Sequence, residues 1–162
     1  EQRITEELDR CQRTSDPLSC LFLDIDYFKR INDQHGHQAG DAVLSGVASA
    51  IKTQLRSNDV LSRYGGEEFV ALLSNIDEAK SLEIGERIRN TVKLLAVQFE
   101  DKTIPVTISI GSATYLPGGK SSGSINIASR LIKTADSALY QAKHNGRNRV
   151  ENGGVVLPLA GE

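Results

Sequence analysis

The stretch from Arg63 to Phe69 reads R-Y-G-G-E-E-F and lies between two apolar runs, Val60-Leu61 and Phe69 to Leu73. Two apolar runs joined by Gly-Gly are typical of a β-hairpin, because glycine reaches the positive φ values of tight primed turns without strain. Glu67 and Glu68 then begin the second strand. A turn without side chains lets a phosphate approach backbone N–H groups, and a carboxylate beside it can hold a bridging divalent cation. The hairpin therefore indicates phosphoryl-transfer chemistry. The alternative interpretation is a hairpin with a solvated acidic edge, which a G-G-E-E motif on its own would favour.

The rest of the chain alternates between strands and amphipathic helices. Leu18 to Ile25 is a nearly continuous apolar run, which predicts a central strand covered on both faces. Apolar residues at helical spacing and turn residues predict helices at 1–13, 27–35, 38–56, 77–95 and 127–142, strands at 97–99, 103–111 and 149–151, and a loop at 114–124. This order predicts an α+β fold: a ferredoxin-like βααββαβ sandwich with a mostly antiparallel central sheet flanked by helices.

The predicted topology brings distant acidic residues together. In a ferredoxin-like sheet the first and third core strands are antiparallel neighbours, so the end of the strand at Asp24 lies beside the start of the strand at Glu67. Paired carboxylates suit a magnesium ion. An aspartate that ends a strand also commonly caps the next helix, and Asp26 is available for that role.

Composition narrows the class of protein. The 162 residues are 39% hydrophobic and 25% charged, which are values of one globular domain. Nineteen basic and 21 acidic residues give a net charge of −2, so no attraction to nucleic acid is expected. Cys11 and Cys20 are expected to be reduced thiols in a cytoplasmic setting. No apolar run reaches the length that a membrane span needs, so we expect no membrane insertion.

We expect one domain over residues 1–152 and a C-terminal tail over residues 153–162. The first predicted helix begins with no preceding loop, which we interpret as a fragment of a longer protein with an N-terminal regulatory domain. Anchoring of the parent protein to a membrane through that region stays open.

Five blocks together carry a family resemblance. Besides the hairpin they are D-I-D-Y-F-K-R-I-N-D (24–33), H-G-H-Q-A-G-D (35–41), T-I-S-I-G (107–111) and A-D-S-A-L-Y-Q-A-K-H-N-G-R-N (135–148). In order and spacing they resemble the GGDEF family of diguanylate cyclases, in its G-G-E-E-F form. The resemblance covers residues 18–150 and implies a fold related to nucleotide cyclase catalytic domains.

The resemblance implies a metal site and its catalytic residues. The carboxylates of Asp24 and Glu67 and the backbone carbonyl of Ile25 would hold Mg²⁺, with Mn²⁺ as a substitute. Glu67 would also accept a proton, and Glu68 would assist it. Metal binding by His35 and His37 is not expected, because no cysteine or third histidine lies near them in the sequence.

The implied substrate is GTP. Asn32 and Asp41 match positions that bind guanine, and a carboxylate that accepts from the N1–H and N2–H groups prefers guanine over adenine. The complete substrate-binding set implied by the resemblance is Lys29, Asn32, His37, Asp41, Gly65, Gly66, Lys143 and Arg147. Its three cations would meet the triphosphate.

The implied enzyme is a nucleotidyltransferase that joins two GTP molecules into cyclic di-GMP across a homodimer. Arg56 and Asp59 form an R-x-x-D pair nine residues before the first hairpin glycine, and Arg87 matches a secondary contact. These three residues match an inhibitory site for the product, since arginine can grip phosphate bidentately.

Three alternatives stay open from the sequence. A catalytically silent relative would bind GTP or cyclic di-GMP as a regulatory domain, yet such relatives lose hairpin residues that are present here. An RNA-recognition module shares the ferredoxin-like core but needs aromatic residues on its central strands, and only 5% of the chain is aromatic. ATP taken alongside GTP is the third alternative, against which Asp41 argues.

Overall fold

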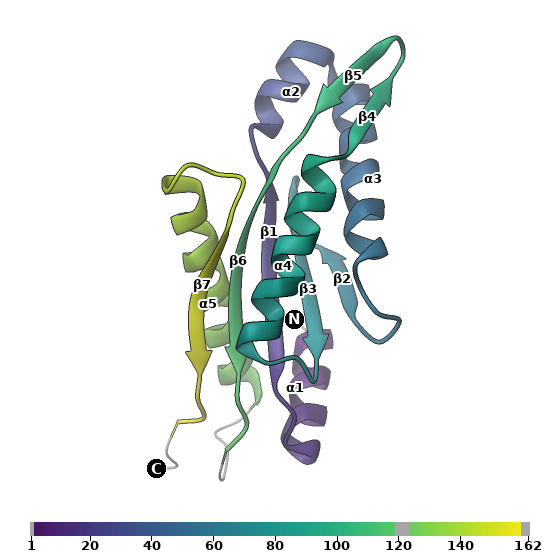
Figure 1. The fold of residues 1–162 in the computed structure, drawn as a ribbon. Coiled ribbons are helices and arrows are strands. Elements are labelled where there is room, and N and C mark those ends of the chain that lie inside the picture. The colour runs from purple at the N-terminus through teal and green to yellow at the C-terminus, as the bar shows by residue number, and fades with distance from the viewer. Residues whose placement is uncertain (1, 119–123, 160–162) are drawn as a thin grey trace.

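The structure is a computed structural model that describes residues 2–118 and 124–159. The elements, in chain order, are α1 (Gln2–Thr14), β1 (Leu18–Ile25), α2 (Phe28–His35), α3 (His37–Thr53), β2 (Val60–Arg63), β3 (Glu68–Ser74), α4 (Glu78–Lys93), β4 (Ala96–Phe99), β5 (Lys102–Pro105), β6 (Ile108–Tyr115), α5 (Ser124–His144) and β7 (Val150–Val156). The main sheet has five strands in the order β2-β3-β1-β6-β7, and only the β6–β7 pair is parallel. The predicted α+β fold with a mostly antiparallel sheet is confirmed (Figure 1).

The central strand β1 is buried along its whole length, as its apolar run predicted. Alternate side chains serve opposite faces of the sheet. Leu21, Leu23 and Ile25 join a core with α3 and α4. Leu18, Cys20 and Phe22 join a second core with α1 and α5. The fold therefore has three layers, and the end of β1 lies where α2 and the small β4–β5 hairpin extend beyond the sheet (Figure 1).

Two predicted strands differ from the observed ones. The predicted strand 103–111 is divided, because β5 pairs with β4 whereas β6 pairs with β1. The change of partner falls after Pro105, which has no N–H group to donate to a ladder. The closing strand β7 is longer than predicted and continues to Val156, so residues 153–156 belong to the sheet. Of the predicted loop 114–124, residues 114 and 115 belong to β6, and residues 119–123 lie outside the described part.

The expected primed turn at the hairpin is wrong. Neither Gly65 nor Gly66 has a positive φ. The Tyr64 N–H donates to the Glu68 carbonyl at 2.8 Å, so the tip is longer than a two-residue turn and needs no left-handed residue. The glycines instead leave the tip without side chains.

The two cysteines, Cys11 and Cys20, are free and buried. Burial raises the pKa of the Cys11 thiol to about 11 and that of Cys20 to about 12. Both are therefore protonated at neutral pH and serve as core residues. None of the described helices combines the length and hydropathy that crossing a bilayer requires.

One glycine in β6 sets how closely α5 packs on the sheet. Gly111 ends the T-I-S-I-G block, and a Cβ at this position would overlap the Ala135 carbonyl oxygen and the Leu139 nitrogen of α5. Backbone atoms of a helix cannot move aside as a side-chain end can. Gly111 thus lets α5 lie directly on β6 and brings the C-terminal end of α5 toward the end of β1.

We expect Gly111→Ala to lower the free energy of unfolding by about 3 kcal/mol or more, because the helix must shift away from the sheet. Urea unfolding followed by circular dichroism measures this change. Gly118→Ala is the matched control, since a Cβ at Gly118 meets nothing within 4 Å. Equal stability of the two variants would contradict the role assigned to Gly111.

Candidate active site

Acidic residues meet where β1 ends and β3 begins. Asp24 pairs with Glu68 across the two strands, and the Ile25 N–H donates to the Glu67 carbonyl at 3.2 Å. Asp24 is 4% exposed, whereas both glutamates are partly exposed. The sequence prediction that Asp24 lies beside Glu67 therefore agrees with the strand register.

A cation from α5 already lies on the Asp24 carboxylate. The Lys143 Nζ donates to the Asp24 Oδ2 at 2.6 Å. The sequence assigned Lys143 to a triphosphate, so this ion pair is a contact that sequence reasoning missed. The 119 residues between the partners explain why no local pattern signalled it.

Burial raises the pKa of Asp24 to about 6, from a usual value of 3.8. The hydrogen bond and the charge of Lys143 lower this pKa, whereas the negative charges of Glu67 and Glu68 raise it further. Ionising Asp24 therefore costs more free energy than ionising an exposed aspartate, and a second cation near it would favour the charged form.

The donor set fits a divalent cation that also binds phosphate. Within the described ranges, no three His, Cys, Asp or Glu side chains form a cage for a metal ion. Magnesium does not need such a cage, because it keeps waters and binds one or two carboxylates together with substrate phosphates. The backbones of Asp24, Ile25 and Glu67 meet at the paired ends of β1 and β3, which makes the two carboxylates and the Ile25 carbonyl the candidates for these ligands.

Arg63 holds the glycine tip of the hairpin in shape. Its Nε donates to the carbonyls of Gly65 and Gly66, both at 3.2 Å, and its Nη2 donates to Gly66 at 2.7 Å. These bonds occupy the Gly65 and Gly66 carbonyls, while the Tyr64 and Gly65 N–H groups both donate to the Glu68 carbonyl. Arg63 was not among the predicted site residues, although its place directly before Y-G-G-E-E-F was a signal.

A cavity lies between α3 and the hairpin, on the sheet face opposite α5. Its volume is about 400 Å³, which suits part of a nucleotide. Leu44, Leu61 and Phe69 form apolar walls, and Asp41 and Arg63 are among the polar residues that line it. Asp41, which the resemblance assigns to the guanine base, lies at this cavity, and its contact with a base stays a prediction.

Asn32 lies against the start of α3. A Cβ on Gly40 would overlap the Asn32 Oδ1, so this glycine allows Asn32 to approach Asp41. The Asn32 Oδ1 is buried and has no hydrogen-bond partner among residues 2–118 and 124–159. An unpaired buried amide oxygen is costly, and a donor from a bound molecule would satisfy it.

The remaining predicted substrate residues lie around the same end of the sheet. Lys29 is exposed on α2, and His37 is the exposed first residue of α3. The Arg147 guanidinium lies over the Tyr27 ring, 4.6 Å from its centre. The cap role expected for Asp26 is wrong: Tyr27 is the N-cap of α2, and the Asp26 carboxylate turns to β6 and to the turn after α5.

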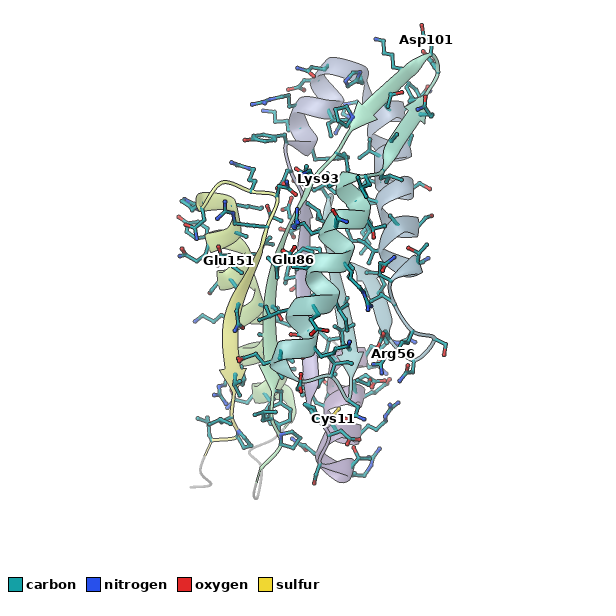
Figure 2. All side chains as sticks on the ribbon, viewed as in Figure 1. Cys11, Arg56, Glu86, Lys93, Asp101 and Glu151 are labelled. Carbon is teal, nitrogen blue, oxygen red and sulfur yellow. The ribbon has the colours of Figure 1, made fainter. Side chains whose placement is uncertain are left out.

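The predicted inhibitory residues lie at the other end of the sheet. Figure 2 shows Arg56 in the connection between α3 and β2, far from Lys93 at the end of α4. The Arg56 side chain pairs with Asp59 through two hydrogen bonds of 3.2 and 2.8 Å, and also donates to the Ser74 carbonyl at the end of β3. Arg87 on α4 donates to the Gln54 carbonyl at 3.4 Å.

The fold and the acidic site define a nucleotide-cyclase type of domain, and comparison with known families agrees. The family model described as "Diguanylate cyclase, GGDEF domain" matches residues 1–149. The chain therefore belongs to the GGDEF family, and the resemblance deduced from the five blocks is confirmed.

Curated relatives and solved structures carry related names. Diguanylate cyclase A of Treponema denticola is 44% identical over 143 residues, which are 88% of this chain and 37% of that protein. Diguanylate cyclase DosC of Escherichia coli is 44% identical over 148 residues, 90% of this chain and 30% of that protein. The chain thus spans about a third of the length of these relatives.

Among solved structures, the GGDEF domain of DgcB from Caulobacter crescentus in complex with c-di-GMP has a TM-score of 0.84 and 30% identity, covering 94% of this chain and 86% of that one. The active GGEEF domain of a diguanylate cyclase from Vibrio cholerae has a TM-score of 0.82 and 34% identity, covering 93% and 92%.

The raised pKa of Asp24 predicts how the protein responds to pH. Because folding favours the protonated acid, this group stabilises the protein fully below pH 3.8, and the contribution is lost as pH rises through about 6. As the pH rises, we expect the contribution of Asp24 to the free energy of unfolding to fall by about 3 kcal/mol. Asp24→Asn should abolish this pH dependence. Urea unfolding between pH 4 and 8, without added metal, measures the difference between the two proteins.

The carboxyl carbon of Asp24 gives a direct control by ¹³C NMR titration. Lys143→Ala should raise the pKa of Asp24 further, since the hydrogen bond and the positive charge are removed. A pKa near 4 in both proteins would contradict this account of the site.

Proposed function

We propose that this chain is a diguanylate cyclase domain, which condenses two GTP molecules into cyclic di-GMP and two pyrophosphates. One observation carries the proposal: Asp24, Glu67 and Glu68 lie at the paired ends of β1 and β3, at the same end of the sheet as a nucleotide-sized cavity that Asp41 lines. Membership of the GGDEF family supports it. GTP as substrate places the reaction in the cytoplasm.

The guanine base enters the cavity between α3 and the hairpin. Asp41 accepts from the N1–H and N2–H groups of the base, and the Asn32 amide completes the recognition. The phosphates extend toward the hairpin tip, where the side-chain-free Gly65 and Gly66 let them approach the backbone. Lys29, His37 and Arg147 surround the substrate at this end of the sheet.

Asp24, Glu67 and the Ile25 carbonyl would hold Mg²⁺, for which Mn²⁺ could substitute. A metal ion held there would neutralise charge on the phosphates during transfer. Lys143 gives up Asp24 when the nucleotide arrives with its cation, and its ammonium then pairs with the phosphates. The exchange keeps the buried Asp24 carboxylate paired with a cation throughout.

The reaction begins when the 3′-hydroxyl of one GTP attacks the α-phosphate of the other. Glu67 accepts the proton and Glu68 assists, while the new O–P bond forms and pyrophosphate leaves with the electrons of the broken bond. A second such step closes the ring. One domain binds one GTP, so two copies of this chain face each other in a homodimer to bring the reacting groups together.

The R-x-x-D pair binds the product and limits its synthesis. Arg56 grips a product phosphate, and Asp59 accepts from a guanine edge, with Arg87 as an additional cation. Because Arg56 and Asp59 bond each other in the free domain, the product replaces an existing ion pair with charge-assisted bonds of the same kind.

The proposal predicts magnesium-dependent synthesis of cyclic di-GMP from GTP by the purified domain, after any bound product is removed. Over a series of protein concentrations, the rate should rise more steeply than linearly, because the active species is a dimer. Glu67→Gln should lower the rate by about a thousandfold, since it removes a metal ligand and the proton acceptor. Chromatography of product and a pyrophosphate assay measure the rate.

Glu100→Gln, in the turn of the β4–β5 hairpin, is a matched control that should keep full activity. GTP binding without product at every protein concentration would contradict the catalytic proposal. That result would favour a domain that binds the nucleotide as a regulatory module.

Arg56→Ala should raise the concentration of cyclic di-GMP needed for half inhibition by about tenfold, because a bidentate phosphate contact is lost. The initial rate without product should stay unchanged, since Arg56 lies at the opposite end of β3 from the acidic residues. Arg13→Ala, at the end of α1, removes another exposed arginine and should change neither quantity. Unchanged inhibition in Arg56→Ala would argue against the R-x-x-D site.

A further inference from the structure

Asp26 is a buried carboxylate that accepts three hydrogen bonds and forms no ion pair within the part of the chain that the structure describes. It is 4% exposed and lies directly after β1. Thr107 Oγ1 donates to its Oδ2 at 2.7 Å, and Ser109 Oγ donates to its Oδ1 at 2.6 Å. The third donor is the backbone N–H of Asn148, 3.0 Å from Oδ2. Asp26 therefore joins β1, β6 and the turn between α5 and β7.

The turn that Asp26 holds is conformationally unfavourable. Arg147 and Asn148 are consecutive non-glycine residues with φ of 64° and 45°. Left-handed conformations are unfavourable for residues with a Cβ atom, so the turn persists only where other bonds hold it. The Arg147 N–H donates to the Ala142 carbonyl, and Arg89 donates to the Asn148 Oδ1. The bond from Asn148 to Asp26 is the one that ties this turn to the end of β1.

The residue after Asp26 holds the other end of Arg147. The Arg147 guanidinium lies 4.6 Å from the centre of the Tyr27 ring, and the Arg30 guanidinium lies 4.4 Å from it. Tyr27 is 49% exposed, so the ring forms a platform at the surface. Two consecutive residues thus fix the backbone and the side chain of Arg147, immediately beyond Asp24 and Ile25.

We propose that Asp26 and Tyr27 are positioning residues, which fix the Arg147 guanidinium in place for a substrate phosphate. The inference rests on the proposed function, because it takes a nucleoside triphosphate as the ligand of Arg147. Asp26 sets the turn through Asn148, and Tyr27 orients the planar guanidinium by stacking. A flexible arginine would otherwise lose rotamer entropy each time that it binds phosphate.

The contacts of Asp26 also separate its role from that of Asp24. A carboxylate offers about four acceptor positions, and three donors already occupy those of Asp26. Among the described residues, the Asp24 side chain has one hydrogen-bond partner, the Lys143 ammonium. The two aspartates of D-I-D therefore have different roles. Asp24 pairs with a cation, whereas Asp26 holds β1, β6 and the turn after α5 together.

A double-mutant cycle tests the proposal with 3′-deoxy-GTP, which lacks the attacking hydroxyl and binds without reacting. Arg147→Ala and Asp26→Ala should each lower its affinity by about tenfold. The double variant should bind no more weakly than Arg147→Ala alone, because Asp26 acts through Arg147. Guanosine, which has no phosphate, should bind all four proteins equally. Calorimetric titration measures these affinities.

Asp26→Asn repeats the cycle with a side chain of equal volume, in case Asp26→Ala does not fold. It should cause a smaller loss, again absent when Arg147 is already alanine. Tyr27→Leu removes only the ring and should follow the same pattern. Ser112→Ala controls for general destabilisation. Ser112 lies on β6, as Ser109 does, and its hydroxyl forms a buried hydrogen bond with Ser81 of α4. Loss of this bond should leave the affinity unchanged.

Three results would overturn the inference. Additive losses in the double variant, or weaker guanosine binding in Asp26→Ala, would assign Asp26 a general structural role while leaving the proposed function intact. Failure of the unaltered chain to bind 3′-deoxy-GTP would overturn the proposed function together with the positioning roles.

Discussion

The burial of β1 on both faces determines the rest of the site. Asp24 and Asp26 lie at the end of this strand, where their carboxylates are shielded from water. Asp24 and Asp26 are each 4% exposed, and a buried carboxylate needs a cation or several hydrogen-bond donors. Asp24 is paired with Lys143 of α5, and Asp26 accepts from β6 and from the turn after α5. The C-terminal part of α5 thus lies at the same end of β1 as the proposed metal ligands.

The alternation of side chains along the sheet separates two tasks at this point. Even-numbered residues of β1 face the core that α5 covers, so Asp24 meets a lysine from that helix. In β3, Phe69 faces the opposite core and forms a wall of the cavity beside α3. In the proposed function, the phosphates and the base therefore belong to different faces of one sheet, and they meet at the glycine tip, where no side chain separates them.

Local patterns in the sequence predicted what depends on neighbours along the chain. The apolar run Leu18–Ile25 gave the bounds of β1, and the hairpin signature gave β2 and β3. The sequence could not predict contacts decided by tertiary packing. The strand expected at 103–111 changes partner beyond Pro105, because its first part pairs with β4 and its last part pairs with β1. The partners of Asp26 lie 81, 83 and 122 residues away along the chain. The sequence near Asp26 therefore could not show whether it bonds distant segments or caps the next helix.

The position of Arg56 constrains how product inhibition can work. Arg56 bonds Ser74 at the end of β3, whereas Glu68 begins that strand, so about 20 Å of buried strand separates the two. A product molecule on Arg56 and Asp59 cannot touch the acidic residues, and a packed central strand transmits little local distortion. The proposed reaction, however, needs two domains face to face. Under the proposed function, inhibition through Arg56 would therefore act by a bound product that holds two domains apart, so that each site stays intact but lacks its opposite substrate.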